Sequence, residues 1–325
     1  MLARSGIAKS FAESMLRFQV TCMPRSNLPA NGTANCARRL CAVLLFFSIS
    51  ILTTIVHAAE IRVFARSWVL LEGKIEKGDY DKIFKIAEFM PGLTEGIYLF
   101  SPGCDVAEAI RIGRLIRRLR WTTDAPLTQQ LRPATSWRML TEHYGLKDPM
   151  QNGQCASACF FIYIAGIYRS GDTLLIHRPY LSETELRRIS GDQVLKMSQV
   201  ARTETDAYLK EMGLPAKYSE LMYSVPKDQV QLLALSDIKA DLDGFIPELK
   251  DWVDARCEKT TNVERVGKNR LLLKPAEKWT SEDKEFLELV SNKEVETIKC
   301  WKHFKLEMRT SAGCDVFAPG KAWCK

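Results

Sequence analysis

The chain has 325 residues, of which 46% are hydrophobic and 26% charged, an ordinary composition for a globular protein with at most two domains. Its formal net charge of +7 would suit a partner such as nucleic acid, but six basic residues and a single acidic one lie before residue 59. The rest of the chain carries an excess of only about two positive charges. We therefore exclude nucleic acid as a partner.

The first 59 residues have the layout of a secretory leader. Arg38 and Arg39 precede an apolar run at 40–56, and residues 56–59 offer small side chains at a cleavage position. We assign 1–59 to a leader and expect the rest of the chain to be exported. The alternative is an uncleaved N-terminal anchor, because the run is slightly long for a signal peptide and slightly short for a membrane span.

The next segment predicts alternating strands and helices. The expected elements are strands at 61–64 and 68–75, an amphipathic helix at 79–89, a buried strand at 97–100 and a helix that starts at Asp105. Asp105 is a candidate N-cap, and Glu108, three residues later, would complete a capping box. The order of these elements predicts a parallel-type α/β core with right-handed crossovers.

The pattern blurs at 121–153, where Pro126, Pro133 and Pro149 interrupt it. We expect an insertion or lid there, beside the site, because such loops often carry specificity. Farther along, the pattern predicts a polar helix at 193–212. A late strand is expected shortly after it, at 230–235.

A short, strongly apolar helix is expected directly after Ser157. Residues 160–166 are apolar on every face and too few to span a bilayer, so they indicate a helix buried within a domain. A turn at 169–172 and a strand at 173–176 follow. This arrangement puts Ser157 in the first turn of the buried helix and His177 at the end of a strand.

Cysteine usage agrees with export. The cysteines beyond the leader are Cys104, Cys155, Cys159, Cys257, Cys300, Cys314 and Cys324. In an oxidising compartment they can form disulfides, and their odd number leaves at least one without a partner among them. The last four lie in the charged, lysine-rich segment 250–325. Because Trp279, Phe286 and Trp301 supply apolar material there, we expect a small C-terminal extension stapled upon itself rather than a disordered tail.

Ser157 and His177 are the residue types of a nucleophile and its base. Serine is a poor nucleophile at its own pKa, so acyl transfer needs an imidazole to take its proton and a carboxylate to orient that imidazole. The structural alternatives are an N-cap serine and a core histidine. Cys155 and Cys159 with His177 could ligate zinc, but a fourth ligand is not evident, so we expect neither a metal nor a cofactor.

Three segments resemble the motifs of the ClpP/crotonase fold: Ser-Pro-Gly-Cys-Asp-Val-Ala-Glu-Ala at 101–109, Cys-Ala-Ser-Ala-Cys-Phe at 155–160 and Ile-His-Arg-Pro at 176–179. They are most similar to those of the secreted, periplasmic ClpP-like proteins of bacteria, and the resemblance covers residues 68–247. It implies an α/β fold with a ClpP/crotonase-like β-β-α superhelix core at 60–249. Residues 250–325 are then the small Cys-containing C-terminal extension.

The resemblance also implies roles for individual residues. Ser157 is the nucleophile, His177 is the base, and the backbone N–H groups of Cys104 and Ala158 form the oxyanion hole. The chain departs from the family at Cys104, where a glycine is usual. If the turn requires a positive φ at this position, the cysteine is strained.

The remaining assignments leave alternatives open. The usual interval from His177 leads to Asp228 as the catalytic acid, with Ser224 and Asp237 as alternatives. If Asp228 has no catalytic role, it is a solvated carboxylate in a loop. The family geometry would bring Cys104 close to the nucleophile. A disulfide from Cys104 to one of the two cysteines that flank the serine is therefore one expectation, and helix packing by those cysteines is the other.

The function implied by the resemblance is that of a periplasmic or otherwise exported serine hydrolase, a peptidase that acts on a peptide or protein substrate. It would meet a membrane only through its N-terminal segment, with 40–56 as an inner-membrane anchor if the leader is retained. Related folds form homo-oligomers, so the resemblance allows a homo-oligomer here as well. The alternative is a catalytically inactive member that serves as an envelope binding or assembly protein, which Cys104 favours. A crotonase-type acyl-CoA enzyme fits the fold but not the compartment.

Overall fold

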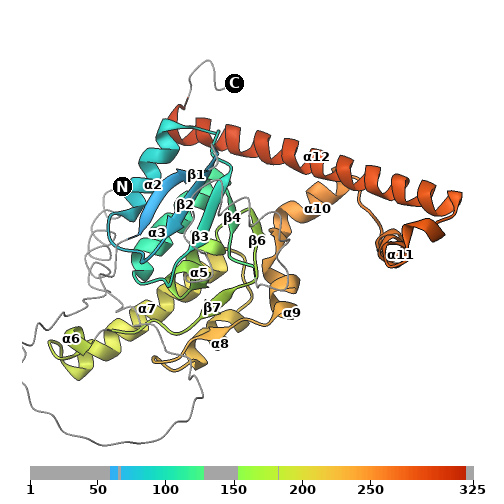
Figure 1. Cartoon of the computed structure of the whole chain (residues 1–325). Helices are drawn as coiled ribbons and strands as arrows, with labels where there is room; N and C mark the ends of the chain where they lie inside the picture. The colour runs from blue at the N-terminus through green and yellow to red at the C-terminus, as the bar shows by residue number, and fades with distance from the viewer. Residues whose placement is uncertain (1–58, 65–66, 128–152, 182, 320–325) are drawn as a thin grey trace, which may run out of the picture.

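The computed structural model describes residues 59–64, 67–127, 153–181 and 183–319 and has a mixed α/β fold (Figure 1). The predicted leader and most of the predicted lid lie outside these residues. Within the described ranges, no helix combines the length and the apolar composition needed to cross a membrane. The predicted α/β class is confirmed.

A six-stranded mixed sheet forms the centre of the domain (Figure 1). Its strands lie in the order β1 (Glu60–Phe64), β2 (Trp68–Glu72), β3 (Gly96–Phe100), β4 (Thr122–Asp124), β6 (Tyr168–Ser170) and β9 (Gly244–Phe245). The four inner strands are parallel, and β1 and β9 run antiparallel at the two edges. The predicted parallel core is therefore confirmed for the inner strands.

The two faces of this sheet bury different residues, because alternate side chains of a strand point to opposite sides. The face toward the main core buries Val69, Leu71, Ile97 and Leu99. The opposite face carries a second cluster of Phe64, Trp68, Leu70, Tyr98 and Phe100. Strands β2 and β3 are thus covered on both sides.

The predicted turn at 169–172 is wrong in its first half. Arg169 belongs to β6 and pairs with Thr123 of β4. The turn is made at Gly171, where φ is 106°. Arg169 is only 2% exposed and donates to the backbone oxygens of Gly166 and Met212. A buried arginine held by carbonyl groups does not follow the apolar pattern from which strands are predicted.

Helices α2 (Asp79–Phe89) and α3 (Val106–Leu119) confirm the two predicted helices that follow β2 and β3. Asp105 caps α3, because its carboxylate accepts from the Glu108 N–H at 2.9 Å. The capping box itself is not formed. The buried Glu108 carboxylate instead accepts from the N–H groups of Gly78, at 2.9 Å, and Tyr80, at 2.8 Å. It therefore places a negative charge at the positive end of α2 and ties the two helices together.

Helix α5 (Ala158–Tyr163) is the predicted buried helix, and all of its side chains are buried. It packs between α3 and α7 (Gly191–Glu211), whose Tyr208 hydroxyl donates to the Phe161 carbonyl oxygen at 2.8 Å. Arg117 of α3 donates to the Ala165 carbonyl oxygen at 2.8 Å, beyond the helix end. The orientation of α5 is thus fixed from both sides.

A second, three-stranded sheet lies next to α5. Its strands are β5 (Cys155–Ala156), β7 (Leu174–Ile176) and β8 (Gln231–Leu232), with β5 and β7 parallel. The strand predicted at 230–235 is shorter than expected, because α9 (Leu235–Asp237) and the π-helical turn η2 (Ile238–Leu242) begin directly after it. Helices α6 (Glu183–Leu186) and α8 (Lys217–Ser224) lie between β7 and β8 in the chain.

The C-terminal extension is helical. It contains α10 (Pro247–Arg256), α11 (Asn262–Leu272), the 3-10 turn η3 (Ala276–Lys278) and the long α12 (Ser281–Phe317). The predicted boundary at 249/250 falls inside α10. A disulfide joins Cys257 to Cys300, beside a small core that includes Val253 and Phe304. The prediction that the extension is stapled upon itself is confirmed for this pair.

The last turns of α12 pack on the α/β domain (Figure 1). The Phe317 ring lies 5.3 Å from the Phe84 ring of α2, measured between centroids. Arg309 donates to the Gly92 carbonyl oxygen at 3.2 Å. Cys314, in the same stretch, is disulfide-bonded. The C-terminal part of α12 therefore contacts α2 and the segment that follows it.

Candidate active site

Ser157 lies at a sharp turn between β5 and α5. Its φ of 56° and ψ of −120° fall in a region that residues other than glycine rarely occupy. Such a conformation costs about 1–3 kcal/mol and persists only where the surroundings hold it in place. Ser157 occupies the N-cap position of α5, as the structural alternative expected, but its side chain makes no capping hydrogen bond to the helix.

Backbone hydrogen bonds hold the strand side of this turn. The Ala156 N–H donates to the Ser101 carbonyl oxygen, and the Ser157 N–H donates to the Leu175 carbonyl oxygen, each at 2.9 Å. On the helix side, the Phe160 N–H donates to the Ser157 carbonyl oxygen at 3.0 Å. The turn is thus anchored to two neighbouring segments, one after β3 and one in β7.

His177 follows β7 at the same edge of the sheet as Ser157. Because Ala156 pairs with Leu175 in a parallel register, Ser157 comes opposite Ile176 and His177 lies one residue farther on. Each of the two side chains is 7% exposed. In the described structure the Ser157 hydroxyl makes no hydrogen bond to the His177 ring. Catalytic hydrogen bonds are often loose without substrate and tighten in the complex.

The tautomer of His177 follows from a hydrogen bond of its ring. Nδ1 lies 2.8 Å from the Arg178 carbonyl oxygen, which can only accept, so Nδ1 carries the proton and Nε2 keeps its lone pair. Burial lowers the pKa of His177 below the ordinary value of 6.5, against a smaller opposing effect of this hydrogen bond. The ring is therefore neutral at pH 7, as a general base must be.

The segment 101–104 lies directly against the serine. A Cβ placed on Gly103 would come 2.6 Å from both the Ala156 oxygen and the Ala158 nitrogen, and 2.8 Å from the Ser157 Cβ. Gly103 has a φ of 88°, and its carbonyl oxygen accepts from the Ile75 N–H at 2.9 Å. Only a glycine fits this approach. The turn that the sequence singled out therefore faces the predicted nucleophile.

The two predicted oxyanion donors differ in their surroundings. The Ala158 N–H, at the start of α5, has no backbone acceptor in the part of the chain that the structure covers. Cys104 has a φ of 139°, so the turn does require a positive φ at the position where this chain has a cysteine. The backbone is strained there. The Cys104 side chain is disulfide-bonded.

The structure does not bring the predicted acid into contact with the histidine. Asp228 is exposed on the turn after α8, three residues before Gln231, which pairs with Ile176. Its carboxylate makes no hydrogen bond to His177 in the described structure. Ser224, the first alternative, donates to the Leu221 carbonyl oxygen at 2.7 Å.

The other alternative acid is also engaged elsewhere. Asp237 lies 3.0 Å from the Lys217 ammonium group. The acceptor that orients His177 is instead the carbonyl oxygen of Arg178. Sequence reasoning missed it because every residue has a backbone carbonyl, so an acceptor of this kind leaves no signal in the sequence.

The cysteines on either side of Ser157 are bonded to each other. Cys155 and Cys159 form a disulfide, with their Cα atoms 5.2 Å apart. The expectation that Cys104 pairs with one of them is wrong. The i, i+4 spacing that suggested zinc ligation brings the two sulfurs together across the turn, and bonded sulfurs cannot act as thiolate ligands.

The arrangement combines a strained, buried serine, a neutral imidazole on the neighbouring strand and a backbone donor at the start of the helix. These are the elements of nucleophilic acyl transfer. No protein-family model matches the chain, and a search of curated proteins finds no match either.

Proposed function

We propose that the chain is a serine hydrolase of the ClpP/crotonase type that cleaves peptide bonds, with Ser157 as nucleophile and His177 as base. The observation that carries this proposal is the backbone conformation of Ser157, φ 56° and ψ −120°, at a strand-to-helix turn. A strained serine at a strand-to-helix turn is typical of nucleophiles held at the end of a sheet. A purely structural serine would gain nothing from this strain.

The proposed reaction is acyl transfer. His177 Nε2 takes the hydroxyl proton as Ser157 Oγ attacks the scissile carbonyl, and the N–H groups of Ala158 and Cys104 stabilise the oxyanion. The imidazolium then returns the proton to the leaving amine, which departs as the acyl-serine forms. Water, deprotonated by the same imidazole, hydrolyses this ester and regenerates the serine. The Arg178 carbonyl oxygen keeps the proton on Nδ1, so that Nε2 is left to accept the serine proton.

The fold type is part of the proposal. It is supported by the meeting of three segments that lie far apart in the chain: the turn after β3, the turn after β5 and the end of β7. An isolated bridge between Ser101 and Cys155 links the first two, and the β5–β7 pairing links the second to the third. In the ClpP/crotonase family, the same three motifs supply the oxyanion turn, the nucleophile and the base.

Export belongs to the proposal as well. Two disulfides between described residues, Cys155–Cys159 and Cys257–Cys300, support an oxidising compartment such as the periplasm. The leader proposed at 1–59 would deliver the chain there, or anchor it through 40–56. The substrate is then a peptide or protein of the envelope, and a homo-oligomer remains compatible with the proposal.

Cys104 supports a second candidate, a catalytically inactive envelope protein that binds or assembles. Its φ of 139° strains the turn that should hold the oxyanion, where a glycine would not be strained. Loss of a single oxyanion donor commonly costs about 10²–10³ in rate. If the strain turns the Cys104 N–H away from the site, binding would remain and catalysis would be lost.

A fluorophosphonate probe separates the two candidates, because it reacts covalently with an activated serine. The full chain is expected to be labelled, and Ser157→Ala and His177→Ala are expected to abolish labelling. Ser198→Ala on α7 and His303→Ala on α12 are matched controls, since both residues are exposed and belong to other elements. Absence of labelling of folded protein from pH 6 to pH 9 would reject the hydrolase and leave the binding protein.

A further inference from the structure

We infer that the Cys155–Cys159 disulfide is a positioning element that holds Ser157 in its strained conformation. This inference rests on the proposed function, because it concerns the reactivity of the same serine. Neither sulfur would touch the substrate. The disulfide acts through the backbone of the residue that lies midway between the two cysteines.

The geometry of the crosslink fits this role. Cys155 is the first residue of β5, and Cys159 lies in the first turn of α5, so the bond closes a ring around the strand-to-helix turn. Four residues of extended chain would separate the two Cα atoms by about 13 Å. The observed separation is 5.2 Å. While the bond is intact, the turn cannot open into an extended segment.

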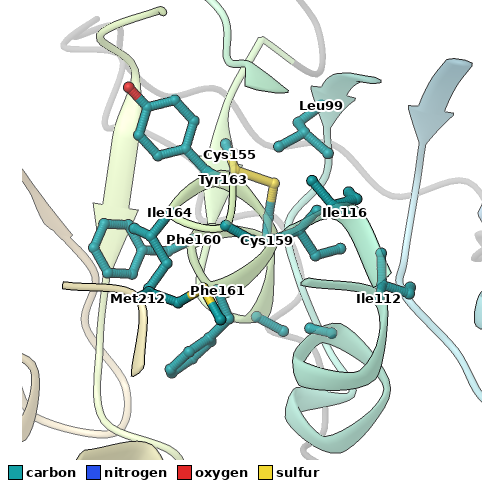
Figure 2. Packing of buried hydrophobic residues seen from close by; sticks show 14 of the residues in the cluster. Leu99, Ile112, Ile116, Cys155, Cys159, Phe160, Phe161, Tyr163, Ile164 and Met212 are labelled. Carbon is teal, nitrogen blue, oxygen red and sulfur yellow. A yellow bond between two sulfur atoms is a disulfide. The ribbon is translucent and has the colours of Figure 1, made fainter. Parts of the chain in front are cut away.

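Both cysteines are wholly buried, at 0% exposure. Figure 2 shows the sulfur–sulfur bond within the main core, which also contains Leu99, Ile116 and Tyr163. The crosslink is therefore embedded in rigid surroundings rather than attached to a mobile surface loop. Any displacement of the turn would have to move this core.

The crosslink adds a covalent constraint on the helix side of the turn. The strand side is held by the hydrogen bonds that Ala156 and Ser157 donate to Ser101 and Leu175. Beyond the serine, α5 has only six residues and no side-chain cap at its start. Short helices are marginal on their own. The disulfide links the first turn of α5, which has no side-chain cap, to the anchored strand side.

The second disulfide provides a matched control. Cys257–Cys300 has a sequence separation of 43, against 4 for Cys155–Cys159. A longer closed loop gains more global stability from its crosslink, at least in the chain-entropy account. Comparing the removal of each disulfide therefore distinguishes a local effect on Ser157 from a general loss of stability.

The experiment compares the full chain with two double variants, Cys155→Ala/Cys159→Ala and Cys257→Ala/Cys300→Ala. Fluorophosphonate labelling rates, thermal midpoints and amide hydrogen exchange of the peptide 155–160 are measured for each. In the first variant we expect a labelling rate at least about tenfold lower, because relief of backbone strain of the usual size moves the serine away from its reactive conformation. We also expect faster exchange at 155–160, and an unchanged pH midpoint of labelling, since His177 is held independently.

In the second variant we expect a larger fall in thermal midpoint, with wild-type labelling and wild-type exchange at 155–160.

Each outcome decides the inference. Wild-type labelling and wild-type exchange in the first variant would overturn it, and so would an equal loss of labelling in both variants. If the unaltered chain is not labelled at all, the hydrolase proposal fails, and exchange alone then judges the disulfide. Faster exchange confined to 155–160 would support its positioning role even then, and unchanged exchange would reject it.

Discussion

His177 Nδ1 lies 2.8 Å from the carbonyl oxygen of the residue that follows it, Arg178. This contact fixes the tautomer of the ring without a carboxylate. Together with burial, which lowers the pKa of His177, it gives a neutral base beside a strained serine.

The pH dependence of Ser157 reactivity should follow the titration of His177. Burial lowers its pKa below 6.5, so the protonated ring, which cannot accept the serine proton, is present only in more acidic solution. We expect the fluorophosphonate labelling rate to rise with pH and to pass its half-maximum below pH 6.5. Rates measured between pH 5 and 8 on folded protein check this. A half-maximum above pH 6.5 would point to a negatively charged partner of the ring.

Asp228→Asn should change the labelling rate by less than about tenfold. In a Ser-His-Asp triad the same change of the acid costs roughly 10⁴-fold, because the wrong histidine tautomer results. Here the Arg178 carbonyl oxygen already selects the tautomer, and Asp228 is exposed. A loss of 10³-fold or more in folded protein would show that Asp228 reaches the ring during the reaction, and would restore it as the catalytic acid.

Gly103→Ala should abolish labelling and also lower stability. The added Cβ would lie 2.6 Å from two backbone atoms of the serine turn, and a φ of 88° disfavours alanine. We expect a loss of about 2 kcal/mol in the free energy of unfolding, measured in urea. Gly191→Ala is the control, because a Cβ at this first residue of α7 meets nothing within 4 Å. Labelling of folded Gly103→Ala at the wild-type rate would contradict the contact between the two turns.

Asp124 should make stability depend on pH. Burial raises its pKa to about 7, against a hydrogen bond from Ser170, with Asp243 also raising it and Lys305 lowering it. Because the folded-state pKa lies above the unfolded value of 3.8, the folded chain binds the extra proton between these values. The contribution of Asp124 to stability is therefore full below pH 3.8 and falls as pH rises toward 7.

The variant Asp124→Asn removes this titration. At each pH, the free energy of unfolding of the variant is subtracted from that of the wild type. This difference should be about 2 kcal/mol lower at pH 8 than at pH 5. Urea unfolding of both proteins at the two pH values measures the difference. An equal difference at pH 5 and pH 8 would mean that Asp124 is charged throughout.

Much of the fold could be predicted because its signals are local. The bounds of α2 follow from its apolar spacing, and the strands on either side of α2 follow from short apolar runs. The positions of Ser157 at the start of the buried helix and of His177 at the end of a strand could also be predicted, whereas the two-residue strand β5 before the serine could not. These features depend on residues close together in the chain.

The features that escaped prediction depend on contacts that the sequence pattern does not record. Glu108 caps α2 from α3, so its partners lie 28 and 30 residues away. The long α12 lacks a steady apolar period because its partner changes along its length. Leu287 and Val290 are buried near its start, Phe304 packs beside Val253 of α10, and Phe317 meets α2.

The central claim is that Ser157 is an activated nucleophile, and mass mapping of a covalent adduct tests it most directly. The full chain is treated with a fluorophosphonate at pH 7.5 and digested, and the modified residue is identified by fragmentation. The account predicts one adduct per chain, on the peptide that contains Cys155 to Phe160 and at Ser157, and none in His177→Ala. An unmodified chain, or an adduct at any other residue, would contradict it.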